Sequence, residues 1–231
     1  MSYRQPFAID EWYHCYNRGV DKRKIFQTKA DYERFLLLLY VCNGTRAVHV
    51  SNLKDRRLHS ILSDTTINRG KTLVEIGAYS LMPNHFHLVL KEIQEGGIAS
   101  FMQKVFTGYT MFFNKKNDRT GALVAGPFKS KHVPNDEYLK HLIAYVHLNS
   151  AELFDSAWKK GTGNRQLLEQ KLPLYSYCSL PDFLGQKRLE NRLIGDSVFS
   201  LFESIPTIQE MLQEAGSYYA EVSGEIIKAS P

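Results

Sequence analysis

The chain has 231 residues, a length that fits one domain with an extension or two small domains. Its hydrophobic content of 43% supplies a folded core, and no apolar run is long enough to span a membrane. The net charge of +5 at pH 7 is compatible with a nucleic-acid partner but does not require one.

Three further absences narrow the function classes. The three cysteines are widely spaced and form no Cys-x-x-Cys pattern, so we expect reduced thiols rather than a zinc site or disulfides. The first residues lack the apolar core of a signal peptide, so we expect a cytoplasmic protein. No phosphate-binding Gly-x-x-x-x-Gly-Lys loop is present, so we expect no nucleotide cofactor.

The first third of the chain predicts one strand, one helix and one irregular insertion. Residues 11–20 are aromatic-rich and predict a strand that ends in an Arg-Gly pair. Residues 30–43 predict a helix, because apolar positions recur at helical spacing and an Asn-Gly pair follows. Residues 44–71 hold six Lys or Arg against two Asp or Glu and have no sustained period. We favour a solvated surface loop with a short strand or helix, and a basic DNA-contacting arm is the alternative.

The middle of the chain predicts a hairpin, two helices and a further strand. Residues 72–82 and 85–92 are expected to be strands joined by a tight link. Residues 98–116 form the clearest amphipathic helix, followed by a loop and a short strand at 127–134. Residues 136–148 predict another helix, with Asn135 or Asp136 as its cap.

This order of elements predicts the fold class. A βαββαβ unit indicates an α+β protein with a ferredoxin-like (RRM-like) antiparallel sheet, to which the helix at 136–148 is an addition. We therefore expect a first domain over residues 1–155, with the insertion at 44–71, and a mostly helical C-terminal extension over 156–231. Within the extension, the apolar stretch 174–185 is expected to dock on the sheet, and 190–202 and 206–222 are expected to be helical.

Two short patterns stand out as candidate chemistry. On a strand, His85 and His87 project from the same face while the apolar residues between and after them face the core, so the imidazoles could form two corners of a metal site. On a helix, Tyr145 and Asn149 lie one turn apart on the same side. Taken alone, however, two such histidines or one helical tyrosine more often serve packing than chemistry.

The string Met-Pro-Asn-His-Phe-His-Leu-Val-Leu at residues 82–90, with Tyr-x-x-x-Asn at 145–149, resembles the REP-associated tyrosine transposases. These are single-tyrosine members of the HUH endonucleases, and the resemblance covers roughly residues 10–155 and more weakly 175–185. It implies that Tyr145 is the nucleophile and that His85, His87 and Asn149 hold a divalent metal, Mg²⁺ or Mn²⁺. Family members often continue with Asn-Pro, whereas Ser150 follows Asn149 here, a difference that we expect to affect only how the helix ends.

The activity that the resemblance implies is DNA transposition. A transposase of this type would cut single-stranded DNA at sites flanked by imperfect hairpins and form a covalent 5′-phosphotyrosine. Both a monomer and a homodimer are known for such transposases, and both stay open. We expect basic side chains to follow the phosphate backbone, namely Arg18, Lys22, Arg23, Lys104, Lys115, Lys116, Arg119, Lys129 and Lys131.

Two other function classes compete with this interpretation. An HUH replication initiator or relaxase would nick DNA, but relaxases usually have three motif histidines and often paired tyrosines. A non-catalytic RRM-like nucleic-acid-binding protein would need exposed aromatic residues on its sheet and would tolerate loss of the histidines or Tyr145.

Overall fold

A computed structural model of the protein describes residues 6–158 and 162–216. Its centre is a four-stranded antiparallel sheet with the strand order β2-β3-β1-β4. The strands are β1 (Trp12–Arg18), β2 (Val74–Met82), β3 (His85–Glu92) and β4 (Lys129–His132). The expected α+β class with an antiparallel sheet is therefore confirmed, and the predicted fourth strand is shorter than expected.

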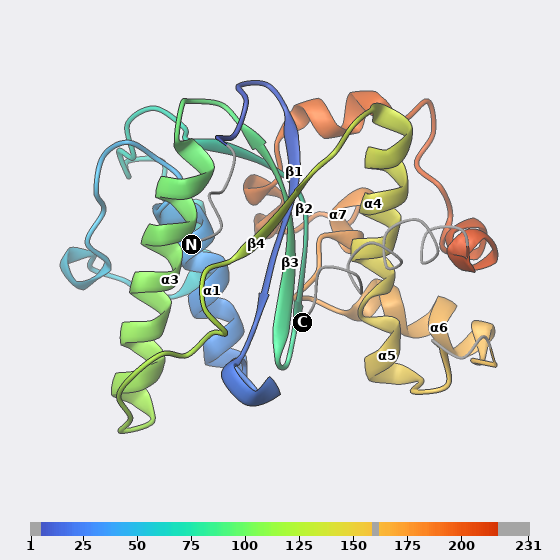
Figure 1. The fold of residues 1–231 in the computed structure, drawn as a ribbon, viewed down its shortest axis with the longest axis horizontal. Coiled ribbons are helices and arrows are strands. Elements are labelled where there is room, and N and C mark those ends of the chain that lie inside the picture. The colour runs from blue at the N-terminus through green and yellow to red at the C-terminus, as the bar shows by residue number, and fades with distance from the viewer. Residues whose placement is uncertain (1–5, 159–161, 217–231) are drawn as a thin grey trace.

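Helices cover both faces of the sheet (Figure 1). One face carries α1 (Lys29–Val41) and α3 (Gly97–Lys116), and the other carries α4 (Asp136–Leu148). The expected cap of α4 is confirmed, because the Asn135 side chain accepts a hydrogen bond from the amide of Tyr138 at 2.8 Å. No helix within the described ranges is long and apolar enough to cross a bilayer.

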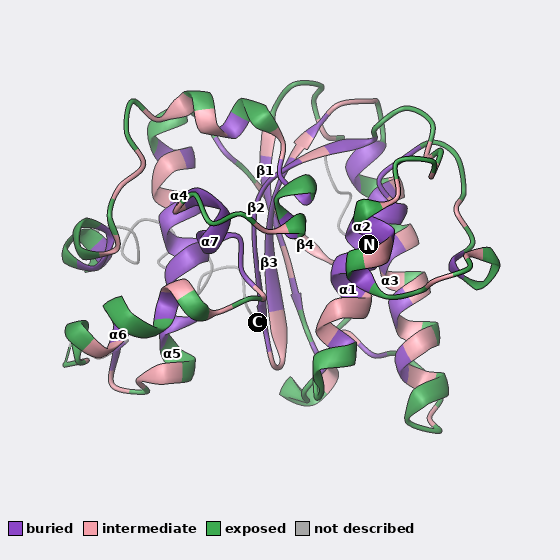
Figure 2. Cartoon of the chain, turned by 180° about the vertical axis from the view of Figure 1, so that it is seen from behind, coloured by how far each residue is buried: buried purple, intermediate pink, exposed green. Residues whose placement is uncertain are grey.

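The hydrophobic core extends over both faces of the sheet, and one part of it lies between the sheet and the pair α1 and α3. Alternation along β3 directs Phe86, Leu88 and Leu90 into this core, where each is fully buried. The Phe86 ring packs 5.5 Å from that of Phe35 on α1 and 5.2 Å from that of Phe106 on α3, measured between ring centroids. Figure 2 shows the buried residues gathered along the central strands. This packing fixes β3 as a rigid element.

The insertion at 44–71 is more ordered than a solvated loop. It contains a 3₁₀ helix (Val50–Asn52) and a short helix, α2 (Leu58–Ser63). The short helix expected within the insertion is therefore present, but Leu58, Ile61 and Leu62 are buried in the core, so this part of the insertion is not solvated as expected. Burial of these three side chains anchors the insertion on α1.

The segment after α4 wraps around β2. It comprises α5 (Ala151–Phe154), α6 (Arg165–Lys171), α7 (Leu180–Phe183) and 3₁₀ helices at Leu172–Leu174, Leu189–Leu193 and Asp196–Leu201. The expected docking of 174–185 on the sheet is confirmed: the Leu81 amide donates to the Tyr177 carbonyl and the Ser179 amide to the Tyr79 carbonyl, each at 2.9 Å. The boundary predicted at residue 155 stays a prediction.

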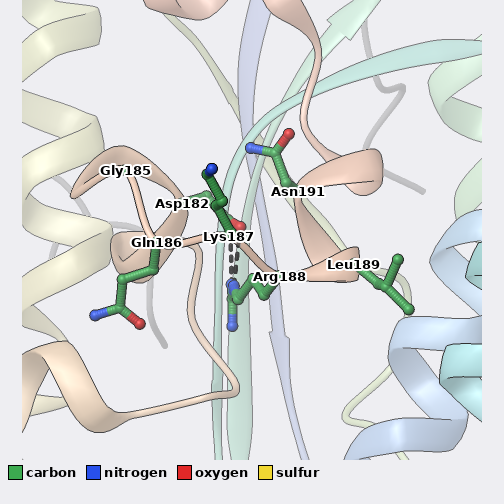
Figure 3. Close-up of a pocket in the computed structure, with 7 residues that line it drawn as sticks. All are labelled: Asp182, Gly185, Gln186, Lys187, Arg188, Leu189 and Asn191. Carbon is green, nitrogen blue, oxygen red and sulfur yellow. Dashed lines mark hydrogen bonds and ion pairs between the residues drawn. The ribbon is translucent and has the colours of Figure 1, made fainter.

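An ion pair holds this wrapping segment in place (Figure 3). The Arg188 guanidinium donates to both carboxylate oxygens of Asp182, at 2.8 and 2.5 Å, and also to the Tyr79 hydroxyl at 2.9 Å. Because Asp182 is buried, loss of Arg188 would leave an uncompensated carboxylate.

The segment 190–202 is helical as predicted, but as two 3₁₀ helices interrupted at Gly195 rather than as one continuous helix. The Gly195 amide donates to the Ile76 carbonyl of β2 at 3.0 Å. A Cβ at this position would lie 2.0 Å from Cγ of Glu75, so any larger residue would have to displace the Glu75 side chain. The helix predicted over 206–222 is present at 208–216, and its remainder lies outside the described residues.

Candidate active site

The histidine pair lies where β3 begins, after the turn at Pro83-Asn84. His85 and His87 share the sheet face that α4 covers, as expected from strand alternation. Their ring centroids lie 5.2 Å apart and the rings are nearly perpendicular, at 88°. The predicted side-by-side arrangement of the two imidazoles is therefore present in the structure.

Helix α4 brings the other two predicted residues to the same place. The Asn149 side-chain oxygen lies 3.1 Å from Nε2 of His85. The ring of Tyr145 lies edge-on to that of His87, with 5.6 Å between centroids. Asn149 follows the last residue of α4 but keeps helical backbone angles, φ −58° and ψ −33°, which preserves its one-turn relation to Tyr145. The structure thus gathers the four side chains, while their chemical roles stay predictions.

The contacts of His85 are compatible with a bound cation in one of the two tautomers of its ring. Nδ1 of His85 lies 2.7 Å from the Asn84 side-chain oxygen, and Nε2 lies 3.1 Å from that of Asn149. A neutral imidazole carries one N–H and one lone pair, so only one of these contacts can be a hydrogen bond from the ring. With the proton on Nδ1, the Nε2 lone pair and the Asn149 oxygen face each other as two acceptors, an arrangement that a metal ion would satisfy.

His87 has a buried partner that sequence reasoning missed. Nδ1 of His87 lies 2.8 Å from Nε2 of His14 on β1, and His14 is 1% exposed. Burial, followed by the charge of Lys131, lowers the pKa of His14 to about 3, which keeps its ring neutral. If His87 donates its Nδ1 proton to His14, its Nε2 atom carries the lone pair, which is the state that a metal ligand requires. Alternation on β1 could have placed His14 on this face, but not beside His87.

The candidate site is largely enclosed. Tyr145 is 6% exposed, His87 is 5% exposed and Asn149 is 2% exposed, whereas His85 at the strand end is half-buried. Packing of α4 against β2 and β3 accounts for this burial. A low-dielectric setting strengthens charge interactions at the site.

The donor set fits a divalent metal ion that takes mixed nitrogen and oxygen ligands. Two imidazole nitrogens and one amide oxygen suit Mn²⁺ better than Mg²⁺ by softness, and both accept additional oxygen ligands. No group of three His, Cys, Asp or Glu side chains suited to a metal occurs within the described ranges. A three-ligand site therefore depends on Asn149.

The sheet separates the predicted DNA-contacting residues into two groups. Residues that are direct cross-strand partners share a face, and the register pairs Arg18 with His85 and Lys129 with Tyr16, itself the partner of His87. Lys131 also lies on this face and donates to the Tyr138 hydroxyl of α4 at 2.8 Å. These three basic residues therefore flank the candidate site.

The other predicted basic residues lie away from the histidine pair. Lys104, Lys115 and Lys116 belong to α3, on the opposite side of the sheet. Two of the rest are tied locally: Arg23 pairs with Asp21 at 3.3 Å, and Arg119 donates to the Asn114 side-chain oxygen at 2.5 Å. Exposed Lys22 follows β1. The structure thus does not gather the predicted set into one surface.

Comparisons with known proteins give one similar structure. No protein-family model and no curated protein matches the chain. Among solved structures, the chain is similar to a REP-associated tyrosine transposase bound to a REP hairpin. The two are 12% identical, the match covers 82% of this chain and 90% of that chain, and the TM-score is 0.49. Identity this low says nothing about the residues of the candidate site.

Proposed function

We propose that the protein is a metal-dependent single-stranded DNA endonuclease and strand transferase of the REP-associated tyrosine transposase type. The observation that carries the proposal is the proximity of Tyr145 to His85, His87 and Asn149, on two elements far apart in the sequence. A phenol beside two imidazoles and an amide oxygen is a suitable set for attack on a phosphodiester.

Tyr145 would act as the nucleophile. Its hydroxyl oxygen would bond to the phosphorus while the bond from phosphorus to the 3′ oxygen breaks. The tyrosine loses its proton and the departing 3′ oxygen gains one, which leaves a free 3′-hydroxyl and a 5′-phosphotyrosine. Because the phosphotyrosine keeps the energy of the broken bond, a second 3′-hydroxyl can reverse the step and join a new strand without a nucleotide cofactor.

The metal ligands would be Nε2 of His85, Nε2 of His87 and the side-chain oxygen of Asn149. A divalent ion bound there would polarise the scissile phosphate and offset the charge that develops on it. The chain's own contribution is orientation: Asn84 and His14 hold the outer nitrogens of the two imidazoles at 2.7 and 2.8 Å. Each Nε2 atom carries the lone pair that a metal needs only if the Nδ1 of the same ring carries the proton.

The proposed substrate is single-stranded DNA that carries imperfect hairpins. Arg18, Lys129 and Lys131 flank the site and would contact phosphates. The sheet order with α1 and α3 on one face fits a ferredoxin-like fold, and α4 adds the nucleophile to it. An RRM-like binder that stacks bases on an open sheet is disfavoured, because α4 packs against β2 and β3 on the face that carries the histidines.

A covalent-adduct assay tests the proposal. The protein is mixed with labelled hairpin DNA from the flanks of its own gene and with Mn²⁺ or Mg²⁺, and is then run on a denaturing gel. We expect a metal-dependent shifted band that Tyr145→Phe abolishes while DNA binding is kept. Tyr40→Phe on α1, across the sheet, is the matched control and should retain the band. An adduct of normal yield in Tyr145→Phe would exclude this nucleophile, and linkage to another tyrosine would favour a relaxase-like enzyme.

A further inference from the structure

A large groove runs along the outer side of α1 and α3. These helices cover the sheet face opposite His85 and His87, so the groove is separate from the candidate active site. Residues 46–58 of the insertion form its other wall, and its volume is about 1160 Å³. Apolar side chains line part of it, including Leu37, Val48, Val50, Phe112 and Met111, which is 68% exposed.

The groove concentrates the positive charge of the protein. Seven lysine and arginine side chains line it, against Glu33 as the one acidic side chain among its described residues. The seven cations and Glu33 together have a net charge of +6, compared with +5 for the whole chain. Two of the seven are neutralised, because Lys116 pairs with Asp31 at 2.7 Å and Arg57 with Asp55 at 2.5 Å. The five others are Arg34, Arg46, Arg56, Lys104 and Lys115.

Arg34 lies at the centre of this charge without an anionic partner in the described part of the chain. Its Nε atom is buried and makes no hydrogen bond, and its guanidinium lies 5.3 Å from the centroid of the Phe112 ring. Burial and the neighbouring charge of Arg56 lower the pKa of Arg34. A half-buried guanidinium whose Nε is unsatisfied and which lies beside a like charge is unfavourable, and a bound anion would offset the like charge.

Two of the cations lie in a row along one side of α3. Lys104 and Lys115 lie eleven positions apart on α3, which corresponds to about 16 Å along the helix axis. Exposed Met111 and half-buried Phe112 lie between them, with Arg34 facing Phe112 from α1. A row of charges beside apolar side chains matches a polymer that alternates phosphates with flat, weakly polar groups.

We propose that this groove is a second nucleic-acid site, which holds the phosphate backbone of DNA on the side of the sheet opposite Tyr145. The proposal rests on the proposed function in taking that DNA to be the flanking part of the cleaved substrate. DNA contact in the groove contributes to binding affinity but not to cleavage, since no groove residue belongs to the candidate active site. An acidic peptide is the competing ligand, but the groove walls are helices and loop and offer no open strand edge for its backbone.

Neutralising exposed groove residues tests the inference. The triple variant Arg46→Gln, Arg56→Gln, Lys115→Gln is compared with a control triple, Arg165→Gln, Lys171→Gln, Lys187→Gln, on exposed residues outside the groove. Both triples remove three charges. Binding of labelled hairpin DNA is followed by fluorescence anisotropy between low and high salt, and circular dichroism checks folding.

We expect the groove triple to weaken DNA binding on the order of 10- to 100-fold at low salt and to reduce the salt slope by about 2 to 3. The control triple should change the affinity by less than about 3-fold. At saturating DNA the adduct yield of the groove triple should equal that of the wild type, while the DNA concentration for half-maximal yield rises with the loss of affinity.

Equal losses of affinity in the two triples, or an unchanged affinity and salt slope in the groove triple, would overturn the inference. Groove-dependent binding of poly-glutamate in place of DNA would also overturn it and assign an acidic protein partner. If the wild-type protein forms no adduct but the groove triple still loses DNA binding selectively, the groove proposal stands and the proposed nuclease activity fails.

Discussion

The two faces of the sheet are built from the same strands but serve different purposes. Toward α1 and α3, β3 presents Phe86, Leu88 and Leu90, each fully buried in the core. Toward α4, the same strand presents His85 and His87. Burial of the three apolar side chains holds β3 in place, so that His85 and His87 on its other face keep a fixed geometry.

The faces also differ in how their polar groups are satisfied. On the α4 side, His87 contacts His14 and His85 contacts two amide oxygens, so each imidazole depends on particular partners. On the other side, five cations from α1, α3 and the insertion face a groove on the outer surface. Substitutions on the α4 side should therefore alter metal binding and cleavage. Substitutions on the α1 and α3 side should alter the free energy of unfolding or the affinity for DNA.

The largest expected effect is loss of metal binding on removal of either histidine. His85→Ala and His87→Ala should each weaken Mn²⁺ binding by more than the roughly 10- to 100-fold cost of losing an indirect partner, because a direct ligand is lost. Mn²⁺ titration followed by electron paramagnetic resonance measures this. His59→Ala on α2, whose side chain is 69% exposed, is the control. Undiminished Mn²⁺ affinity in either variant would remove that histidine from the site.

A core substitution on the same strand should separate stability from chemistry. Phe86→Ala should lower the free energy of unfolding by about 3–5 kcal/mol, since it leaves a cavity among closely packed rings. Urea denaturation measures the loss, and Leu174→Ala, at a side chain 71% exposed, should change it by less than about 0.5 kcal/mol. A loss below about 1 kcal/mol for Phe86→Ala would contradict the role of this face as the anchor.

The partner of His87 should have an intermediate effect. His14→Leu removes the acceptor for the His87 Nδ1 proton and should weaken Mn²⁺ binding by about 10- to 100-fold. His14→Gln can still accept that proton and should recover part of the affinity, which a purely steric role would not predict. Mn²⁺ titration of both variants, with their melting temperatures, separates orientation from misfolding. Equal affinities in the two variants would argue against an orienting role.

The smallest expected effect concerns a buried carboxylate on the α1 and α3 side. Burial by itself would raise the pKa of Asp31, but hydrogen bonds from Lys116 and from the amides of Gln27 and Thr28 lower it below its usual value of 3.8. The lowered pKa means that ionised Asp31 stabilises the fold above about pH 4, and that this contribution is lost as the pH falls through the folded-state pKa.

Asp31→Asn should therefore lower the free energy of unfolding by about 2 kcal/mol at pH 7. The difference from the wild type should shrink as the pH falls below 3.8, where Asp31 becomes protonated. Urea denaturation across this pH range measures both. Glu33→Gln, which breaks only an exposed pair with Lys29, should cost less than about 0.5 kcal/mol. A difference that stays constant with pH would rule out the charge as its cause.

Much of the fold could be predicted from local periodicity, and so could the pairs of site residues that share a face within one strand or one helix. Period two placed His85 and His87 on one face, and the helical period placed Tyr145 and Asn149 on one side. The segment 190–202 shows the limit, because contact of Gly195 with Ile76 and Glu75, far away in sequence, divides the predicted helical stretch into two 3₁₀ helices.

What the sequence by itself determined was which side chains share a face within one strand or one helix. The family resemblance predicted that Asn149 lies beside His85, and the structure places them 3.1 Å apart. Only the tertiary structure decided that His14 lies behind His87 and that the insertion closes a basic groove against α1 and α3. The physical reason is that strand register and helix docking are set by the total apolar surface buried between distant segments. Local spacing determines which residues share a face within a segment, but it does not specify which distant segment that face packs against.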